Sequence, residues 1–183
     1  MTRYRITIFV AITLFLIAGL TPIMAEPIKN QERSKQINNI KSNTNLLCEE
    51  QTQGFEKALA IPTNLLTAIS LAETGKWNKK TELLHTWPWT LKTNGEIYYL
   101  PSKDSAVAKG RSLRAKGIKN ISVGCMQVNL FYHPKAFENL DAAFDPERNV
   151  GYAANFLVAL RKSTLSWPQA TANYNSIELS KNH

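Results

Sequence analysis

Apolar and polar positions divide the chain into three stretches of different character. Residues 6–20 are almost entirely apolar, whereas residues 26–47 are rich in Asn, Lys, Gln and Ser and contain no aromatic residue. From Cys48 onward, apolar residues recur at the three- and four-residue spacing that is typical of helices. A stretch with as little apolar surface as 26–47 cannot fold alone. We therefore expect a flexible leader at 26–47 and a folded domain at 48–183.

The N-terminal stretch has the features of a secretory signal peptide. Arg3 and Arg5 precede the apolar run, and the small residue Ala25 follows it. A basic head, an apolar run of this length and a small-residue exit are typical of a segment that is removed during export. We therefore expect a signal peptide at 1–25 and a periplasmic protein. Residues 6–25 could also just span a bilayer core, so an uncleaved membrane anchor is the alternative.

Spacing and capping residues predict that most of the folded part is helical. We expect a first helix over 48–60, a second over 64–73 and a third from 103 to about 116, with two further helices that begin after Asp145 and Ser166. Thr63, Ser102 and Asp145 are the expected N-caps, because their side chains can accept a hydrogen bond from the first turn. Gly75 is expected to end the second helix.

One β-hairpin is expected between the second and third helices. Asn94-Gly95 separates two short segments rich in Trp, Thr, Ile and Tyr, at 87–91 and 97–100. An Asn-Gly pair is favoured in tight hairpin turns, because both positions take a positive φ. The fold class expected from these patterns is mainly α, with a small β-hairpin insertion.

Length and charge restrict the possible partners. With 183 residues the chain fits one domain. Its net charge of +8 is compatible with anionic partners such as cell-wall polymers or phospholipid head groups, and equally with a basic surface that has no dedicated partner. Export and the lack of a basic stripe with interleaved aromatics argue against nucleic acid. His85, His133 and His183 have no ligand spacing, and no glycine-rich phosphate loop is present. We expect no metal and no cofactor.

Glu73 is the strongest candidate for chemistry in the pattern itself. It follows Leu66 and Ile69 at helical spacing, so a carboxyl group occupies the last position of an apolar stripe. Apolar surroundings disfavour the charged form and raise the pKa of a carboxyl group. A glutamic acid with a raised pKa can protonate a glycosidic oxygen. The alternative is a helix-terminal Glu that points to solvent.

Four short motifs in order resemble those of the soluble lytic transglycosylases, lysozyme-like enzymes that cleave peptidoglycan. They are Ala72-Glu-Thr-Gly75, Val123-Gly-Cys-Met-Gln-Val-Asn129, Phe144-Asp-Pro-Glu-Arg-Asn-Val150 and Ala172-Asn-Tyr-Asn175. The resemblance extends from about residue 48 to 176 and implies a lysozyme-like helical fold. The Trp87-Pro-Trp hairpin resembles an insertion found in a subset of these proteins.

The resemblance also implies residue roles. Glu73 would be the catalytic acid and base, Gln127 would bind the saccharide, Tyr174 would stand near Glu73, and Asn129 would shape the same loop. Each of the last three has a structural alternative: Gln127 and Asn129 could satisfy loop backbone groups, and Tyr174 could pack between helices.

Two further residues of the motifs are assigned to the substrate site. Thr74 stands where a Ser often follows the catalytic Glu, and Met126 lies beside Gln127. For Met126, packing in the core is the favoured interpretation. Cys125 departs from the Leu that is common in this motif, and His183 leaves little chain for the terminal helix that usually closes the domain.

The reaction that the resemblance implies is cleavage of the MurNAc–GlcNAc bond with formation of 1,6-anhydro-MurNAc. A non-catalytic peptidoglycan-binding assembly module and a hydrolytic lysozyme are the alternatives. The expected partners are peptidoglycan glycan strands, together with a secretion, pilus or flagellar apparatus, and the expected state is a monomer. Action within strands and action at their ends are both compatible with the sequence.

Cys48 and Cys125 are the only cysteines, and an oxidising compartment favours their pairing. We therefore expect one disulfide that joins the start of the first helix to the loop beside Gln127. Two buried thiols are the alternative.

Overall fold

The structure, a computed structural model, describes residues 31, 33, 44, 46–79 and 81–179. The chain divides into two compact units, Met1–Asn38 and Asn39–His183, and the helices and strands named below belong to the second. The signal peptide expected at 1–25 lies outside the described residues. Within the described part of the chain, no helix has both the length and the apolar character needed to cross a membrane.

The fold class is confirmed, since the described chain is mainly α-helical with small antiparallel sheets. Residues 46–58 form the first helix, which is followed by α2 (Leu65–Thr74), α3 (Lys103–Ala115), α4 (Leu140–Ala143), α5 (Pro146–Thr164) and α6 (Trp167–Leu179). Residue 44 is also helical and buried, so helical structure begins before Cys48, within the stretch expected to be a leader.

The strands are more numerous than the single expected hairpin. β1 (Lys76–Asn78) and β2 (Leu83–His85) pair into a separate antiparallel hairpin, and a four-stranded sheet has the order β4-β3-β5-β6. Its strands are β3 (Thr90–Thr93), β4 (Glu96–Tyr99), β5 (Ser122–Val123) and β6 (Val128–Asn129). Strands of two or three residues are too short to show an alternating pattern, which is why the sequence predicts only β3 and β4.

The expected turn between β3 and β4 is confirmed. Asn94 and Gly95 take φ values of 49° and 80°, as a two-residue hairpin turn requires. The expected starts of α3 and α5 are confirmed too, because Ser102 and Asp145 each accept a hydrogen bond from a first-turn N–H. At these two helices the residue expected to cap the first turn does so with its own side chain.

The start of α2 differs from the expectation. Its N-cap is Asn64 rather than Thr63, and Asn64 has a left-handed φ of 65° without a side-chain cap. The buried Glu56 carboxylate of the first helix accepts the N–H groups of Asn64 at 2.8 Å and Thr67 at 3.0 Å instead. A neighbouring helix thus supplies the cap, which the local sequence does not reveal.

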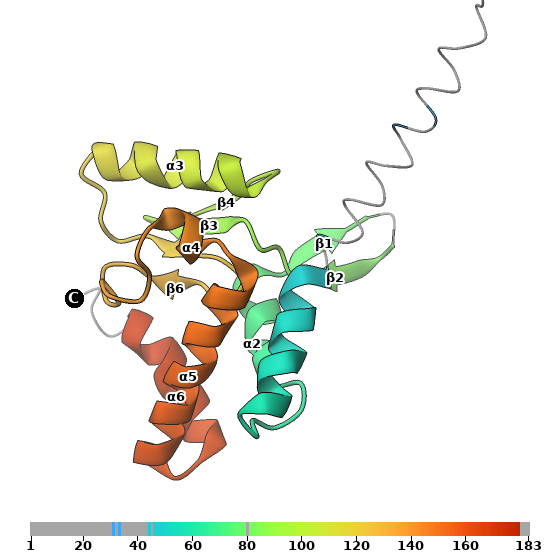
Figure 1. Cartoon of the computed structure of the whole chain (residues 1–183), viewed down its shortest axis with the longest axis vertical. Helices are drawn as coiled ribbons and strands as arrows, with labels where there is room; N and C mark the ends of the chain where they lie inside the picture. The colour runs from blue at the N-terminus through green and yellow to red at the C-terminus, as the bar shows by residue number, and fades with distance from the viewer. Residues whose placement is uncertain (1–30, 32, 34–43, 45, 80, 180–183) are drawn as a thin grey trace, which may run out of the picture. The chain divides into compact units, whose positions relative to one another are not determined.

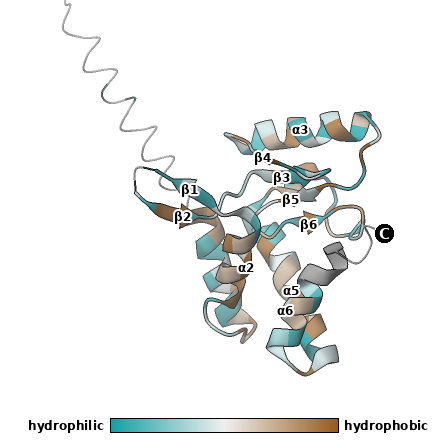
Figure 2. Ribbon diagram, turned by 180° about the vertical axis from the view of Figure 1, so that it is seen from behind, coloured by the Kyte–Doolittle hydropathy of each residue, from teal (hydrophilic) through white to brown (hydrophobic). Residues whose placement is uncertain are grey.

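Two hydrophobic cores each include residues of the segment 123–128, which contains the turn between β5 and β6. Leu66, Met126 and Leu157 belong to the core of the first helix, α2, α5 and α6, whereas Leu91 and Val123 belong to the core of the sheet, α3 and α4. Figures 1 and 2 show the sheet between α3 on one side and α5 and α6 on the other. The segment 123–128 therefore passes from one core to the other.

Candidate functional site

Glu73 lies in the last turn of α2, at the border of the buried face of that helix. The buried residues of α2 are Leu66, Ile69, Ser70 and Thr74, and Glu73 itself is half-buried. The apolar stripe expected to end at Glu73 therefore continues to Thr74.

The chain leaves α2 abruptly after Thr74. The Gly75 N–H donates to the Leu71 carbonyl at 2.9 Å, and Gly75 has a φ of −57°, not the left-handed φ that is usual for a glycine after a helix. A Cβ at Gly75 would lie 2.4 Å from the Leu71 oxygen. Glycine is required here by the close approach of the backbone, and not by its φ.

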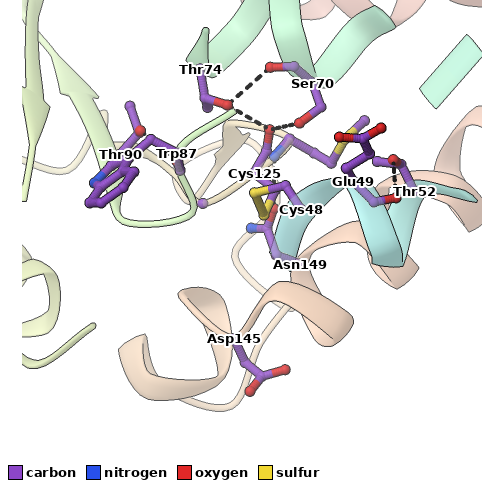
Figure 3. The surroundings of a disulfide bond; sticks show 12 residues. Cys48, Glu49, Thr52, Ser70, Thr74, Trp87, Thr90, Cys125, Asp145 and Asn149 are labelled. Atoms are coloured by element: carbon purple, nitrogen blue, oxygen red, sulfur yellow. Dashed lines mark hydrogen bonds between the residues drawn. A yellow bond between two sulfur atoms is a disulfide. The ribbon is translucent and has the colours of Figure 1, made fainter. Parts of the chain in front are cut away.

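The end of α2 is hydrogen-bonded to the turn 124–127, which connects β5 to β6. Ser70 Oγ donates to the Cys125 carbonyl at 2.9 Å, and Thr74 Oγ1 lies 3.0 Å from the Ser70 carbonyl and 3.4 Å from that of Cys125 (Figure 3). Thr74 has no exposed surface. The Thr74 hydroxyl therefore connects the end of α2, next to Glu73, to the turn 124–127, and it does not face a ligand.

The same turn is held covalently by the expected disulfide. Cys48 and Cys125 are bonded, with their Cα atoms 5.6 Å apart (Figure 3). The pairing predicted from the cysteine count is confirmed, and it links the first helix to the residue that accepts the Ser70 hydrogen bond.

Asn149 of α5 completes the support of the turn, and sequence reasoning did not single it out. Its Oδ1 accepts the Met126 N–H at 2.9 Å, and its Nδ2 donates to the carbonyls of Val123 at 3.0 Å and Ala143 at 2.9 Å. Asn149 is fully buried. The sequence did contain a signal for this role, since Asn149 stands beside Val150 on the apolar face of α5. A buried amide must find hydrogen-bond partners, so an Asn at this position indicates a polar contact inside the core.

Gln127 is the most distinctive residue of the turn. It has a φ of 47°, and its Nε2 donates to the carbonyls of Thr90 at 3.1 Å and Gly124 at 3.0 Å. Only 2% of its surface is exposed, and its Oε1 accepts no hydrogen bond within the described part of the chain. Buried acceptors are rarely left unpaired, so Gln127 Oε1 offers a place for a donor.

Three of the expected site residues line one small cavity. Gln127, Asn129 and Tyr174 border it together with His133, Tyr152 and Phe156. Tyr174 Oη donates to the Met126 carbonyl at 2.9 Å, which ties α6 to the turn. The cavity is partly open and has room for at least one water molecule. Glu73 does not line this cavity. It is connected to the cavity through its neighbour Thr74, which is hydrogen-bonded to the turn 124–127.

Asn129 and Met126 hold the loop together. Asn129 Nδ2 donates to Asn120 Oδ1 at 2.6 Å and Ser122 Oγ at 3.2 Å, while its Oδ1 accepts the Phe131 N–H at 3.0 Å. The Met126 side chain is fully buried in the core. These are the environments expected if Asn129 satisfies groups of the loop and Met126 packs in the core.

An aromatic group beside the cavity was not expected from the sequence. His133 Nδ1 is hydrogen-bonded to Tyr152 Oη at 2.8 Å, and the His133 ring lies 4.9 Å from that of Phe156. Burial lowers the pKa of His133 and raises the pKa of Tyr152, so both are uncharged near neutral pH. Within the described residues, no group of three His, Cys, Asp or Glu side chains could hold a metal ion.

Comparison with protein families gives one match. The model described as Transglycosylase SLT domain matches residues 52–183, which is well over half of the chain. The matched part contains Glu73, the turn 124–127 and Tyr174. Comparisons with curated proteins and with solved structures found no match.

Proposed function

Because the chain belongs to the transglycosylase SLT family, we propose that it is a lytic transglycosylase that cleaves the MurNAc–GlcNAc bond of peptidoglycan glycan strands. The observation that carries this proposal is the hydrogen bonding between the two motifs of the site, one around Glu73 and one around Gln127. Thr74, next to Glu73, and Ser70 are both hydrogen-bonded to the carbonyl of Cys125, two residues before Gln127. The proposed acid and the proposed saccharide-binding loop are thus connected by the hydrogen bonds of Ser70 and Thr74.

The proposed reaction uses Glu73 twice. Its carboxylic acid donates a proton to the glycosidic oxygen as the bond from that oxygen to C1 of MurNAc breaks. The carbonyl oxygen of the MurNAc acetamido group stabilises the positive charge that develops at C1. The Glu73 carboxylate then removes the proton of the O6 hydroxyl of the same sugar, and O6 forms the new bond to C1. An intramolecular hydroxyl has a large effective concentration, which favours ring closure over attack by water.

Gln127 and Tyr174 are the proposed partners of the substrate beside Glu73. The Oε1 of Gln127 has no hydrogen bond from the described residues, so a hydroxyl or amide N–H of the saccharide could donate to it after a small movement of the turn. Tyr174 holds that turn through the Met126 carbonyl and lines the same cavity. The raised pKa expected for the Glu73 carboxyl stays a prediction, which NMR titration of labelled Glu tests.

Product analysis tests the proposal directly. Digestion of purified peptidoglycan should release muropeptides that end in 1,6-anhydro-MurNAc, and mass spectrometry distinguishes them from hydrolytic products, which carry one additional water. Glu73→Gln should abolish turnover, because an amide cannot donate the proton, and should leave saccharide binding intact. Glu50→Gln, on the exposed side of the first helix, is the matched control and should keep full activity.

Each alternative has its own outcome in this experiment. Reducing-end MurNAc as the main product would identify a hydrolytic lysozyme, which needs a second carboxylate. Binding of glycan strands without any product from folded protein would identify a non-catalytic module. Family membership implies a peptidoglycan substrate and hence a periplasmic or extracellular location, and N-terminal sequencing of exported protein tests cleavage after Ala25.

A further inference from the structure

The β3–β4 hairpin contacts the chain immediately after the proposed catalytic residue. Tyr99, the last residue of β4, donates its hydroxyl hydrogen to the Gly75 carbonyl at 3.0 Å. Gly75 follows Glu73 by two residues and is the point at which the chain leaves α2. A residue 24 positions away therefore fixes the direction of this exit.

Lys76, the next residue, is held by aromatic rings on the same side. Its ammonium lies 4.9 Å from the Trp87 ring centroid and 5.4 Å from that of Tyr99, within the range of cation–π attraction. Trp87 is itself rigidly placed, because its Nε1–H donates to the Leu100 carbonyl at 2.6 Å and its ring packs edge-on against Trp89. The cluster Lys76, Trp87 and Tyr99 is called the aromatic clamp below.

The last turn of α2 and the chain that follows it are thus held by two sets of contacts. Thr74 is hydrogen-bonded to the Cys125 carbonyl of the turn 124–127. After the helix, the Gly75 carbonyl accepts the Tyr99 hydroxyl, and Lys76 contacts the Trp87 and Tyr99 rings. Glu73 directly precedes these residues, so its Cα–Cβ direction depends on the backbone that both contacts fix. A displacement of about 1 Å can reduce a catalysed rate by roughly 100-fold.

We propose that Tyr99, supported by Trp87 and Lys76, is a positioning residue that orients Glu73 for proton transfer. This inference rests on the proposed function, because it takes Glu73 to be the catalytic acid. Tyr99 acts through the backbone of Gly75. The Trp87-Pro-Trp hairpin thereby has a role in catalysis and not only in the stability of the sheet.

The neighbouring tyrosine offers a matched control. Successive strand residues point to opposite faces of a sheet, and Tyr98 accordingly has other partners. Its hydroxyl donates to Glu96, and its ring lies 4.0 Å below the Lys109 ammonium. Tyr98→Phe and Tyr99→Phe each remove one hydroxyl and keep the ring, and only the second removes the hydrogen bond to Gly75.

The test compares the kinetics of the two variants on soluble glycan strands. Tyr99→Phe should lower kcat roughly tenfold, because the misplaced carboxyl group transfers its proton more slowly. Its KM should stay within about twofold of the parent value, since an interaction lost only in the transition state lowers kcat and kcat/KM equally. Tyr98→Phe should leave both constants unchanged, and the two variants should have similar Tm values.

A second pair of variants tests the other half of the clamp. Lys76→Arg should keep the parent kcat, because a guanidinium group also stacks on aromatic rings. Lys76→Met removes the charge and keeps the aliphatic length, so it should lower kcat without raising KM. Equal kcat values for Lys76→Arg and Lys76→Met would contradict the role of the cation–π contacts.

A readout besides activity separates this inference from the proposed function. The carbonyl ¹³C shift and the amide exchange of Gly75 should change in Tyr99→Phe and not in Tyr98→Phe. If Glu73→Gln keeps full turnover, the assignment of Glu73 fails and the positioning role fails with it. If Glu73→Gln is inactive and Tyr99→Phe has the kcat of Tyr98→Phe, or differs only in KM, the positioning role alone is overturned.

Discussion

Gly124 has two separate reasons to be a glycine. Its φ is +79°, which other residues rarely adopt, and a Cβ there would lie 2.3 Å from the Asn149 Nδ2 atom. Asn149 in turn holds the Met126 N–H and the Val123 carbonyl on either side of it. The turn that carries Gln127 can therefore form only around a residue without a side chain.

A comparison of two glycines separates these two reasons. Gly117 has nearly the same φ of +80°, but nothing lies within 4 Å of a Cβ built there. We expect Gly117→Ala to lower the free energy of unfolding by about 1 to 2 kcal/mol, the strain of the left-handed backbone alone. Gly124→Ala should lower it by at least about 2 kcal/mol more, because it also breaks the buried hydrogen bonds of Asn149. Urea denaturation measures both, and equal losses would contradict the close contact.

At the scale of elements, the turn between β5 and β6 is the point where the helices meet the sheet. The first helix reaches it through the disulfide, α2 through Ser70, α5 through Asn149 and α6 through Tyr174. Strand β3 reaches it through the Thr90 carbonyl, which accepts the Gly124 N–H at 3.0 Å. Each of these elements therefore contributes a contact that helps to fix the turn carrying Gln127.

Removal of the disulfide should show how much of this arrangement depends on it. The bond joins residues that are 77 positions apart, and the double variant Cys48→Ala with Cys125→Ala should be less stable by about 4 to 5 kcal/mol, mainly because the unfolded chain gains entropy. Thermal unfolding of the variant and of the oxidised parent measures the difference. A loss below about 1 kcal/mol would mean that the noncovalent contacts hold the turn by themselves.

At the scale of the whole molecule, the stability should depend on two histidines. Burial, and secondarily the nearby Lys76 ammonium, lowers the pKa of His85, and burial lowers the pKa of His133 below the ordinary value of 6.5. Between these lowered values and 6.5, the unfolded chain binds more protons than the folded one. The stabilising contribution of these two uncharged histidines is therefore fully present above pH 6.5 and is lost as the pH falls below it.

A pH series of thermal unfolding tests this dependence. The Tm of the parent protein should decrease from about pH 7 to pH 5, and the decrease should be smaller in the double variant His85→Gln with His133→Gln. Glutamine keeps hydrogen-bonding groups and has no proton to gain in this range. An equally steep decrease in the double variant would assign the pH dependence to other groups.

The sequence by itself determined the features that depend on neighbouring residues. Ser102 and Asp145 start their helices with their own side chains, and Asn94-Gly95 takes the positive φ values that this residue pair favours in a hairpin turn. The cysteine count was enough for the disulfide because only one pairing exists. The motifs around Glu73 and Gln127 were likewise enough to indicate the family, because the residues of each motif are contiguous in the chain.

Only the tertiary structure decided how the site is held. Glu56 caps α2 from another helix, Asn149 binds the turn from 23 residues away, and Tyr99 reaches Gly75 across 24 residues. In each case the partner is a backbone N–H or C=O group, which every residue apart from proline presents alike, so no side-chain type marks it in the sequence. The strands β5 and β6 are likewise set by pairing across the sheet, because two residues carry too little pattern to specify a strand.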